Sequence, residues 1–434
     1  MSTPETYGNW SREDLIARLV LLENRTLPKI KPGSSKLWQP RSFPRRKIAL
    51  KFCYSGWEYG GLAIQPEGTP LPTVEGELYN ALGKARLIDP DAGLEGCAWQ
   101  RCGRTDRGVS AAGQVVSLWI RSALLPYVRM LNRILPLTIR VLAWSPVAPD
   151  FSARFSCASR YYKYFFHPDA LDVDAMQDAC KRLLGTHDFR NLHKHDPAKQ
   201  LTAFERTILR AEVVPVESSD GYPHQVDART GMWVLNLEGT AFLYHQVRHI
   251  MAVLLLVGAG LEPPSVVSAL MNTAPGAEPG CDTIHACKPP YQMADGLPLM
   301  LWDCVYPPGT VSWQLDEIAP GEPASSYSTQ YEIMKSILRQ AQVYAALDAH
   351  FLRAARIVGH VPPPSVPRSA TTPEGLAPES IAVPFGGGVY RRIEAAKYVP
   401  LLQRPPLEHV EVVNERWRER KGLTGRVPVE ADDE

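Results

Sequence analysis

An aspartate set among arginines and glycines is the residue whose surroundings most suggest chemistry. Asp106 lies in the segment RCGRTDRGVSA at 101–111, which also carries Arg101, Gly103, Arg104, Arg107 and Gly108. Neighbouring guanidinium groups keep a carboxylate ionised even when it is partly buried, and such a carboxylate can act as a nucleophile or a base. The glycines permit tight turns and close approach of a ligand. A structural Asp–Arg salt bridge in a turn is the alternative, and spacing alone does not decide between the two.

A second segment mixes aromatic rings with cations. It reads FSARFSCASRYYKYFF at 151–166 and contains Arg154, Arg160 and Lys163. Aromatic faces stack on bases while cations meet phosphates, so the mixture is typical of RNA contact. The alternative is a core strand whose long cationic side chains reach solvent at its edge.

A third segment, FLYHQVR at 242–248, places His245 and Arg248 at the start of an apolar helix. A buried arginine needs an anionic partner. Either Asp106 or an RNA phosphate could serve, unless Arg248 lies on a solvent-facing rim of the helix. The three segments together therefore bring one carboxylate, aromatic rings and several cations into consideration for a single site.

A basic stretch precedes all three. Seven positive charges and no acid lie from Lys29 to Lys47, and the stretch ends in Arg45, Arg46 and Lys47. It is either a phosphate-contacting arm or a solvated linker or nuclear-import patch. Before it, SRED at 11–14 followed by leucines at helical spacing predicts a short helix.

The elements that must position these residues mix strands and helices without a regular βαβ repeat. This pattern favours an α+β fold with mostly antiparallel pairing. Strands are expected at 46–54, 114–120, 161–166, 208–215, 232–237 and 299–305, and helices at 74–87, 126–135, 174–184, 242–257 and 328–347. No Walker loop, dinucleotide-binding glycine fingerprint or internal repeat is present.

Composition bounds the remaining possibilities. The 434 residues suffice for two to four domains, and 45% hydrophobic with 21% charged residues is ordinary for a globular chain. The net charge of +1 excludes a uniformly basic surface. The longest apolar run, 250–261, is too short to cross a bilayer, so no membrane partner is expected. Eight cysteines without CxxC spacing and an N-terminus unlike a signal peptide suggest reduced thiols in the cytosol or nucleus.

The three segments, taken together, resemble the TruA-type tRNA pseudouridine synthases. Arg104-Thr-Asp-Arg-Gly-Val109 resembles the family's GRTDxGV motif, Arg154-Phe155 with Arg160-Tyr-Tyr-Lys-Tyr164 its RF…RYxY motif, and 242–248 followed by Val257-Gly258 its FL…MVR…VG motif, with Gln246 in place of Met. The resemblance covers about residues 46–306, with all three motifs in order.

This resemblance implies roles for particular residues. Asp106 would be the nucleophile, attacking the target uridine at C6 of the base or C1′ of the sugar, and Tyr162 would stack on the flipped uracil and serve as a base in the sugar steps. Arg248 would pair with Asp106, and Arg104 would fill the space of the everted base. Arg101, Arg107, Arg154, Arg160, Lys163, His245, Arg45, Arg46 and Lys47 are expected to bind substrate, with Arg121, Arg129 and Arg133 along the tRNA path.

The resemblance extends to a branch of the family. CGRTD at 102–106 with Ser110, LDVDAM at 171–176, HDFRNL at 187–192 and KYVPL at 397–401 look like the eukaryotic branch that modifies positions 38 and 39 of the anticodon stem-loop. One departure is HKHD at 193–196, where members often read CKMD. The same chemistry at other uridines, and an inactive tRNA-binding scaffold, are the alternatives.

The implied architecture is the pseudouridine synthase fold, with two α+β halves joined through one mainly antiparallel sheet around a central active-site cleft. The expected domains are an N-terminal helix and basic arm at 1–45, halves at 46–157 and 158–306, and a C-terminal extension at 307–434 with a proline-rich flexible insertion at about 360–388. A homodimer in the nucleus and cytoplasm, acting on tRNA without a cofactor, is expected. No metal is expected. The set of Cys281, His285 and Cys287 lacks a fourth ligand at typical spacing, and the set of His187, His193, His195 and Asp196 lies in a polar loop of a kind that is common without metal.

Overall fold

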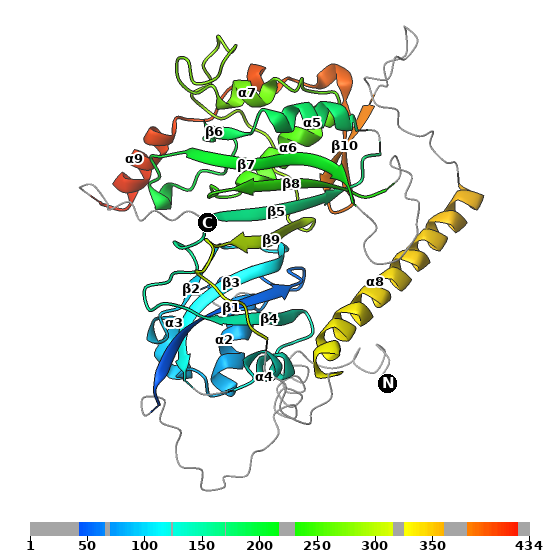
Figure 1. The fold of residues 1–434 in the computed structure, drawn as a ribbon. Coiled ribbons are helices and arrows are strands. Elements are labelled where there is room, and N and C mark those ends of the chain that lie inside the picture. The colour runs from blue at the N-terminus through cyan, green and yellow to red at the C-terminus, as the bar shows by residue number, and fades with distance from the viewer. Residues whose placement is uncertain are drawn as a thin grey trace, which may run out of the picture. The chain divides into compact units, whose positions relative to one another are not determined.

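One mixed sheet forms the centre of the described structure. The computed structural model describes residues 43–65, 70–122, 125–169, 171–216, 231–315, 325–359 and 380–423. The strands of the sheet are β1 (Arg45–Tyr54), β2 (Gln100–Arg101), β3 (Ser110–Arg121), β4 (Ile139–Pro146), β5 (Ser159–Phe166), β6 (Gly185–Asp188), β7 (Glu205–Pro215), β8 (Trp233–Gly239) and β9 (Leu299–Val305). Among these residues their order is β4-β1-β3-β9-β5-β8-β7-β6, with β2 paired to β3 (Figure 1).

The seam of the sheet is the pairing of β3 with β9. It is parallel and short, with Ser110 opposite Met300 and Ala111 opposite Leu301. Every other strand pair of this sheet is antiparallel among the described residues. The expected joined, mainly antiparallel sheet is therefore confirmed, and the segment between 101 and 111 enters the sheet at the seam.

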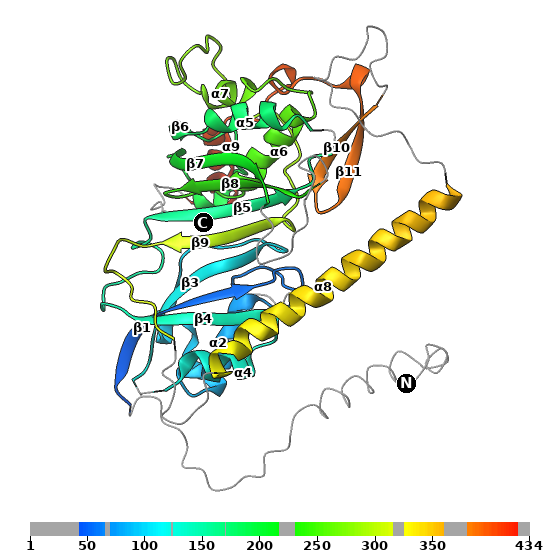
Figure 2. The ribbon, with the colours of Figure 1, turned by 45° about the vertical axis from the view of Figure 1, so that its right-hand side comes forward.

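Helices flank the sheet on either side of the seam. They are α2 (Val74–Lys84), α3 (Gly93–Gly96), α4 (Tyr127–Ile134), α5 (Val173–Lys181), α6 (Gln246–Gly258) and α7 (Val266–Met271). In the views of Figures 1 and 2, α2 and α4 accompany β1 and β4, while α5 and α6 accompany β7 and β8. Contacts of α4 with β4, and of α5 with both α6 and β7, agree with these views.

Helix starts follow from local capping chemistry. Thr73 accepts a hydrogen bond from Gly76 N at 3.2 Å and begins α2, and Asp172 accepts one from Ala175 N at 2.9 Å and begins α5. Such caps satisfy amide groups that have no partner within the helix. Helix α6 begins at Gln246 and not at 242 as expected, because His245 leaves the helical conformation with φ 61° and ψ 14°.

Strand β5 shows how the core is built. Tyr162, Tyr164 and Phe166 are buried, whereas Tyr161 and Lys163 between them are half-buried. The alternation follows from the two-residue period of a strand. Burial of each large apolar side chain contributes about 1.5–3 kcal/mol, so one face of β5 helps to build the core.

The C-terminal extension contains the helices α8 (Ser325–Val358) and α9 (Val410–Arg420) and the hairpin β10 (Ser380–Gly386) with β11 (Val389–Glu394). The expected flexible insertion at 360–388 is therefore wrong from residue 380 onward. Val383 is buried, and Tyr164 Oη donates to Phe385 O at 3.3 Å, which ties the hairpin to the core. Residues 360–379, and residues 1–42 of the helix and arm expected at 1–45, lie outside the described residues. None of the helices in the described part of the chain could span a membrane.

Candidate active site

The turn that carries Asp106 is fixed by its neighbours on three sides. Val109 N donates to Asp106 O at 3.1 Å and closes the turn, in which Gly108 has φ 84°. Leu62 N donates to Thr105 O at 3.1 Å, and Tyr54 Oη and Thr105 Oγ1 share a buried hydrogen bond of 2.6 Å. The backbone around the carboxylate is therefore held rigidly at the seam of the sheet.

The Asp106 carboxylate meets two donors from the start of α6. Arg248 Nη1 lies 2.9 Å and His245 Nε2 3.0 Å from the same oxygen, Asp106 Oδ2. The Asp106 side chain is 21% exposed, against 13% for Arg248 and 6% for His245. The predicted pairing of Arg248 with Asp106 is what the geometry shows, and it leaves Asp106 partly open to solvent.

Electrostatics keep this carboxylate charged. Burial alone would raise the pKa of Asp106, but the hydrogen bond and charge of His245 and those of Arg248 outweigh it. The pKa of Asp106 therefore lies below its usual value of 3.8. A carboxylate that is ionised at neutral pH and open on one side is suited to nucleophilic attack.

A small pocket opens beside the carboxylate. Tyr162 reaches it from β5, and its ring meets the edge of Phe242 at a centroid distance of 5.1 Å and an interplanar angle of 85°. Residues from both halves line the pocket: Arg104, Thr105, Asp106, Val109, Tyr162, His245, Val247, Arg248 and Leu299. The four residues predicted to be catalytic thus line one pocket.

A loop before β9 holds Arg248 from behind. Arg248 Nε donates to Ala294 O at 2.9 Å, and Ala294 N donates back to Arg248 O at 3.2 Å. A Cβ on Gly296 would lie 3.1 Å from Arg107 O and 3.6 Å from Arg248 Cζ. No motif marks residues 294–296, so this support could not be predicted from the sequence.

Three of the predicted site arginines have side chains that are at least partly open to solvent: Arg104, predicted to be catalytic, and Arg107 and Arg154, predicted to bind substrate. Arg104 and Arg107 are exposed on the Asp106 turn. Arg154 is half-buried with its guanidinium 5.0 Å from the Phe155 ring, which is itself 73% exposed. Arg101 instead forms an ion pair with the buried carboxylate of Glu75 at 3.3 Å. The first three stay candidates for RNA contact.

Three other predictions need correction. Arg160 is buried and donates to the carbonyls of Thr240, Cys102 and Arg154, so it joins β5 to the Asp106 segment and does not face a ligand. Lys47 is also buried and donates to Pro149 O at 2.7 Å. Lys163 lies on the face of β5 opposite Tyr162, with Nζ 4.5 Å from the Trp302 ring.

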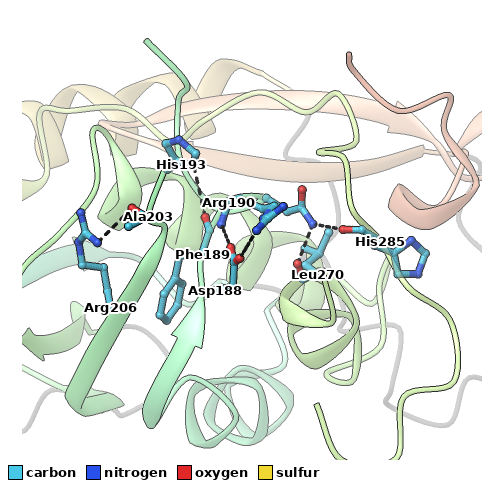
Figure 3. Close-up of polar contacts among 9 residues, drawn as sticks. Asp188, Phe189, Arg190, His193, Ala203, Arg206, Leu270 and His285 are labelled. Atoms are coloured by element: carbon cyan, nitrogen blue, oxygen red, sulfur yellow. Dashed lines mark hydrogen bonds and ion pairs between the residues drawn. The ribbon is translucent and has the colours of Figure 1, made fainter. Parts of the chain in front are cut away.

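The basic residues at the start of β1 and the histidines around β6 also have defined hydrogen-bond partners. Arg45 Nη2 donates to Gly96 O at 2.8 Å and Arg46 Nε to Ser122 Oγ at 2.9 Å. At the end of β6 and in the loop that follows it, Figure 3 shows Asp188 paired with Arg190, and a hydrogen bond between the His193 ring and Phe189 O. The other two histidines of this region have partners of their own, since His187 pairs with Glu278 and His195 with Asn414. The side chains of these histidines thus point to separate partners.

Comparisons with known proteins agree with one another. A family model described as tRNA pseudouridine synthase matches residues 179–307, the part of the chain that carries His245 and Arg248. A protein of Saccharomyces cerevisiae named tRNA pseudouridine(38/39) synthase is 34% identical over 96% of this chain and 92% of its own length. Proteins of the same name from Homo sapiens and Mus musculus are 41% and 42% identical, over 63% and 60% of this chain and 58% and 56% of theirs.

Proposed function

Since the chain belongs to the tRNA pseudouridine synthase family, we propose that it isomerises uridine to pseudouridine at positions 38 and 39 of the tRNA anticodon stem-loop. The yeast, human and mouse relatives carry these positions in their names. The observation that supports catalysis in this chain itself is the ionised Asp106, held by Arg248 and His245 beside Tyr162 in one pocket.

The reaction replaces the N1–C1′ bond between uracil and ribose with a C5–C1′ bond. The Asp106 carboxylate attacks at C6 of the base or C1′ of the sugar, the bond between N1 and C1′ breaks, and the base rotates. C5 then bonds to C1′, the bond to Asp106 breaks and releases the carboxylate, and the proton on C5 is lost while N1 gains one. No atom is added and no electron is transferred overall, so we propose that the reaction needs no cofactor.

We assign a separate role in the reaction to each of three pocket residues. Arg248 pairs with Asp106 and keeps it ionised, and the Tyr162 ring offers a stacking face with a hydroxyl at its end. Extraction of a base costs a few kcal/mol, least in loops and at the ends of stems. We expect Arg104, which is exposed and lines the pocket, to fill the space that the base leaves.

Mapping of pseudouridine tests the assignment. The wild-type chain and the Asp106→Ala variant are expressed in cells that lack their own synthase for these positions, and pseudouridine is mapped across total tRNA. Wild type should restore pseudouridine at 38 and 39, and Asp106→Ala should restore neither. Restoration at other uridines alone would support the alternative substrate, and activity in Asp106→Ala would refute the role of Asp106.

We also propose that the protein is a homodimer, and helix α8 supports this. Its described side chains are exposed apart from the half-buried Ile333 and Lys335, and large apolar residues recur at intervals of seven at Ile337, Tyr344 and Phe351. Leu347 lies on the same stripe, between Tyr344 and Phe351. Monomeric proteins rarely leave so long an apolar stripe open to water, and a seven-residue spacing is typical of helices that pair with each other.

Light scattering can decide the oligomeric state. Ile337→Asp combined with Phe351→Asp should halve the mass measured for wild type. Gln342→Asp combined with Ala346→Asp introduces the same charges on the opposite side of α8 and should leave the mass unchanged. A wild-type monomer, or a double variant that stays dimeric, would contradict pairing through α8.

We further propose that the protein is located in the nucleus and cytoplasm, which the basic stretch at 29–47 supports. A fluorescent fusion of the chain can be used to follow this location.

A further inference from the structure

His245 has a backbone conformation that ordinary helix capping does not require. Its φ of 61° lies in the left-handed region, which is uncommon and strained for a residue with a side chain. It occupies the position before α6, yet its side chain makes no hydrogen bond to the helix amides. The strained conformation instead directs the imidazole toward Asp106.

The surroundings fix the imidazole in that direction. The His245 ring stacks on the Tyr244 ring at a centroid distance of 3.7 Å and an interplanar angle of 31°. The adjoining backbone is locked because Gln246 Oε1 accepts from Leu243 N at 2.7 Å and Gln246 N donates to Leu243 O at 2.9 Å. With 6% of its side chain exposed, His245 has little access to an RNA phosphate.

We propose that His245 is a positioning residue for the nucleophile: together with Arg248 it holds Oδ2 of Asp106, so that Oδ1 is presented to the uridine. This replaces the RNA contact expected from the sequence, and it rests on the proposed role of Asp106. His245 Nε2 and Arg248 Nη1 reach Oδ2 at 3.0 and 2.9 Å from residues one helical turn apart.

Two donors fix the orientation of the Asp106 carboxylate, which a single donor does not. A single donor to Oδ2 leaves the carboxylate able to swing about its bond to Cβ, whereas two donors from different directions define its plane. Misplacement of a reacting atom by about 1 Å can cost about 10²-fold in rate. Removal of the His245 donor should therefore slow the chemical step by roughly 10²-fold while tRNA affinity changes little.

His245→Gly is the informative variant, because glycine adopts φ 61° without strain. Its single-turnover rate on an anticodon stem-loop should fall by roughly 10²-fold and should rise again when free imidazole fills the space left by the ring. His245→Gln places an amide donor at similar reach and should recover much of the rate without imidazole. Gln200 shows that glutamine adopts φ 49° in this chain. Arg248→Ala, treated in parallel, should be slow with or without imidazole.

The outcomes distinguish a failure of the positioning role of His245 from a failure of the proposed function. A His245→Gly rate within threefold of wild type overturns the positioning role, and so does a slow rate that neither imidazole nor His245→Gln restores. If His245→Gly does not fold, the comparison of His245→Gln with His245→Glu decides, because the two differ only in offering Asp106 a donor or a second carboxylate. Inactive wild type, or active Asp106→Ala, would instead refute the proposed function itself.

Discussion

At the scale of single residues, the charge state of one carboxylate depends on a balance of opposed effects. Asp106 lies deep enough that burial disfavours its charge, and the donors His245 and Arg248 reverse this. The same donors leave one side of the residue open, where Tyr162 and Arg104 line the pocket. A site that removed Asp106 further from water would need more donors and would leave less room for a nucleoside.

Tyr162 can be assigned one of two roles by substitution. Tyr162→Phe keeps the stacking face and removes the hydroxyl, while Tyr162→Leu removes both. If the hydroxyl acts as a base, Phe should be nearly as slow as Leu, by ~10²–10⁴-fold in single-turnover kinetics. We expect this result. A fast Phe variant with a slow Leu variant would reduce the role to stacking, which is worth about 1–3 kcal/mol per base.

Lys288 gives a prediction for the pH dependence of stability. Its ammonium donates to His193 O and lies 3.2 Å from the ring nitrogens of His249. Burial, and then the charge of Lys194, lowers its pKa from 10.5 to about 7. Between these values the unfolded chain binds the proton and the folded chain does not, so the free energy of unfolding should rise with pH from about 7 toward 10.5.

Urea unfolding of wild type and Lys288→Met across this range measures the effect. The Met variant lacks the titrating group, so it should be the more stable of the two near pH 7, and its advantage should shrink as the pH rises. Parallel pH profiles for the two proteins would show that Lys288 keeps its ordinary pKa in the fold.

The sequence predicted the residues of the pocket better than those around it. Asp106, Tyr162, Arg248 and Arg104 were named from motifs, and all four line the pocket. Arg160 and Lys163 were misplaced, because a pattern of cations and aromatics does not reveal which face of a strand is covered. The contact of His245 with Asp106 depends on a positive φ, which no pattern of residue types announces.

At the scale of elements, the Asp106 turn depends on the end of β1. A Cβ added at Gly56 would lie 2.0 Å from Val109 O, which is closer than any real contact, and Gly56 N donates to Ser110 Oγ at 3.0 Å. The glycine is thus required by close approach of two backbones and not by its own φ. The turn that carries the nucleophile and the start of β3 are packed directly against it.

Gly56→Ala should therefore damage activity as well as stability. The backbone at Val109 must move to admit the methyl group, and Asp106 moves with it. We expect a lower melting temperature and a slower single-turnover rate. Gly93→Ala is a useful comparison, because a Cβ at Gly93 meets nothing within 4 Å, so only its φ of 66° is strained. Equal rates in Gly56→Ala and wild type would mean that the turn adapts without disturbing the carboxylate.

Most strands and helices of the two halves were foreseeable from periodicity, whereas β4, β6, α7, α9 and the hairpin of β10 and β11 were not. The long strand β3 and helices α2 and α5 lie where alternation and helical spacing placed them. Strand β10 could not be predicted, because it overlaps the end of the proline-rich stretch at 362–384, whose composition is typical of a loop. It is nevertheless ordered, because Val383 enters the core and Tyr164 bonds to Phe385 O. Such tertiary contacts override local propensity.

At the scale of the whole molecule, RNA affinity must come from charges gathered locally, since the net charge is only +1. The described start of β1 divides the basic stretch: Arg45 is exposed and Arg46 half-buried, whereas Lys47 is buried. The joined sheet could be predicted once the family resemblance was recognised. Its parallel seam could not, because Ser110 and Met300 carry no pattern that pairs them.

The salt dependence of tRNA binding tests whether Arg45 and Arg46 contact phosphates while the buried Lys47 does not. Arg45→Ala combined with Arg46→Ala should weaken binding and reduce the slope of log affinity against log salt by about 0.7–0.9 for each phosphate that the variant no longer neutralises. Lys47→Ala removes one positive charge from a buried position. It should leave the slope of log affinity against log salt unchanged and should lower the free energy of unfolding. A double variant with the slope of wild type would make the stretch a linker.

The two-residue pairing at the seam has a consequence for the order in which the protein is made. Ser110 and Met300 are separated by 190 positions, so the strand that completes the seam is synthesised long after the strand that it joins. At about 5–20 residues per second, an emerging chain waits roughly 10–40 s between the two. For most of that interval Asp106 has left the ribosome without Arg248, and its turn cannot yet be fixed against β9. A nascent enzyme is therefore inert toward the tRNAs that crowd the ribosome until its second half is complete.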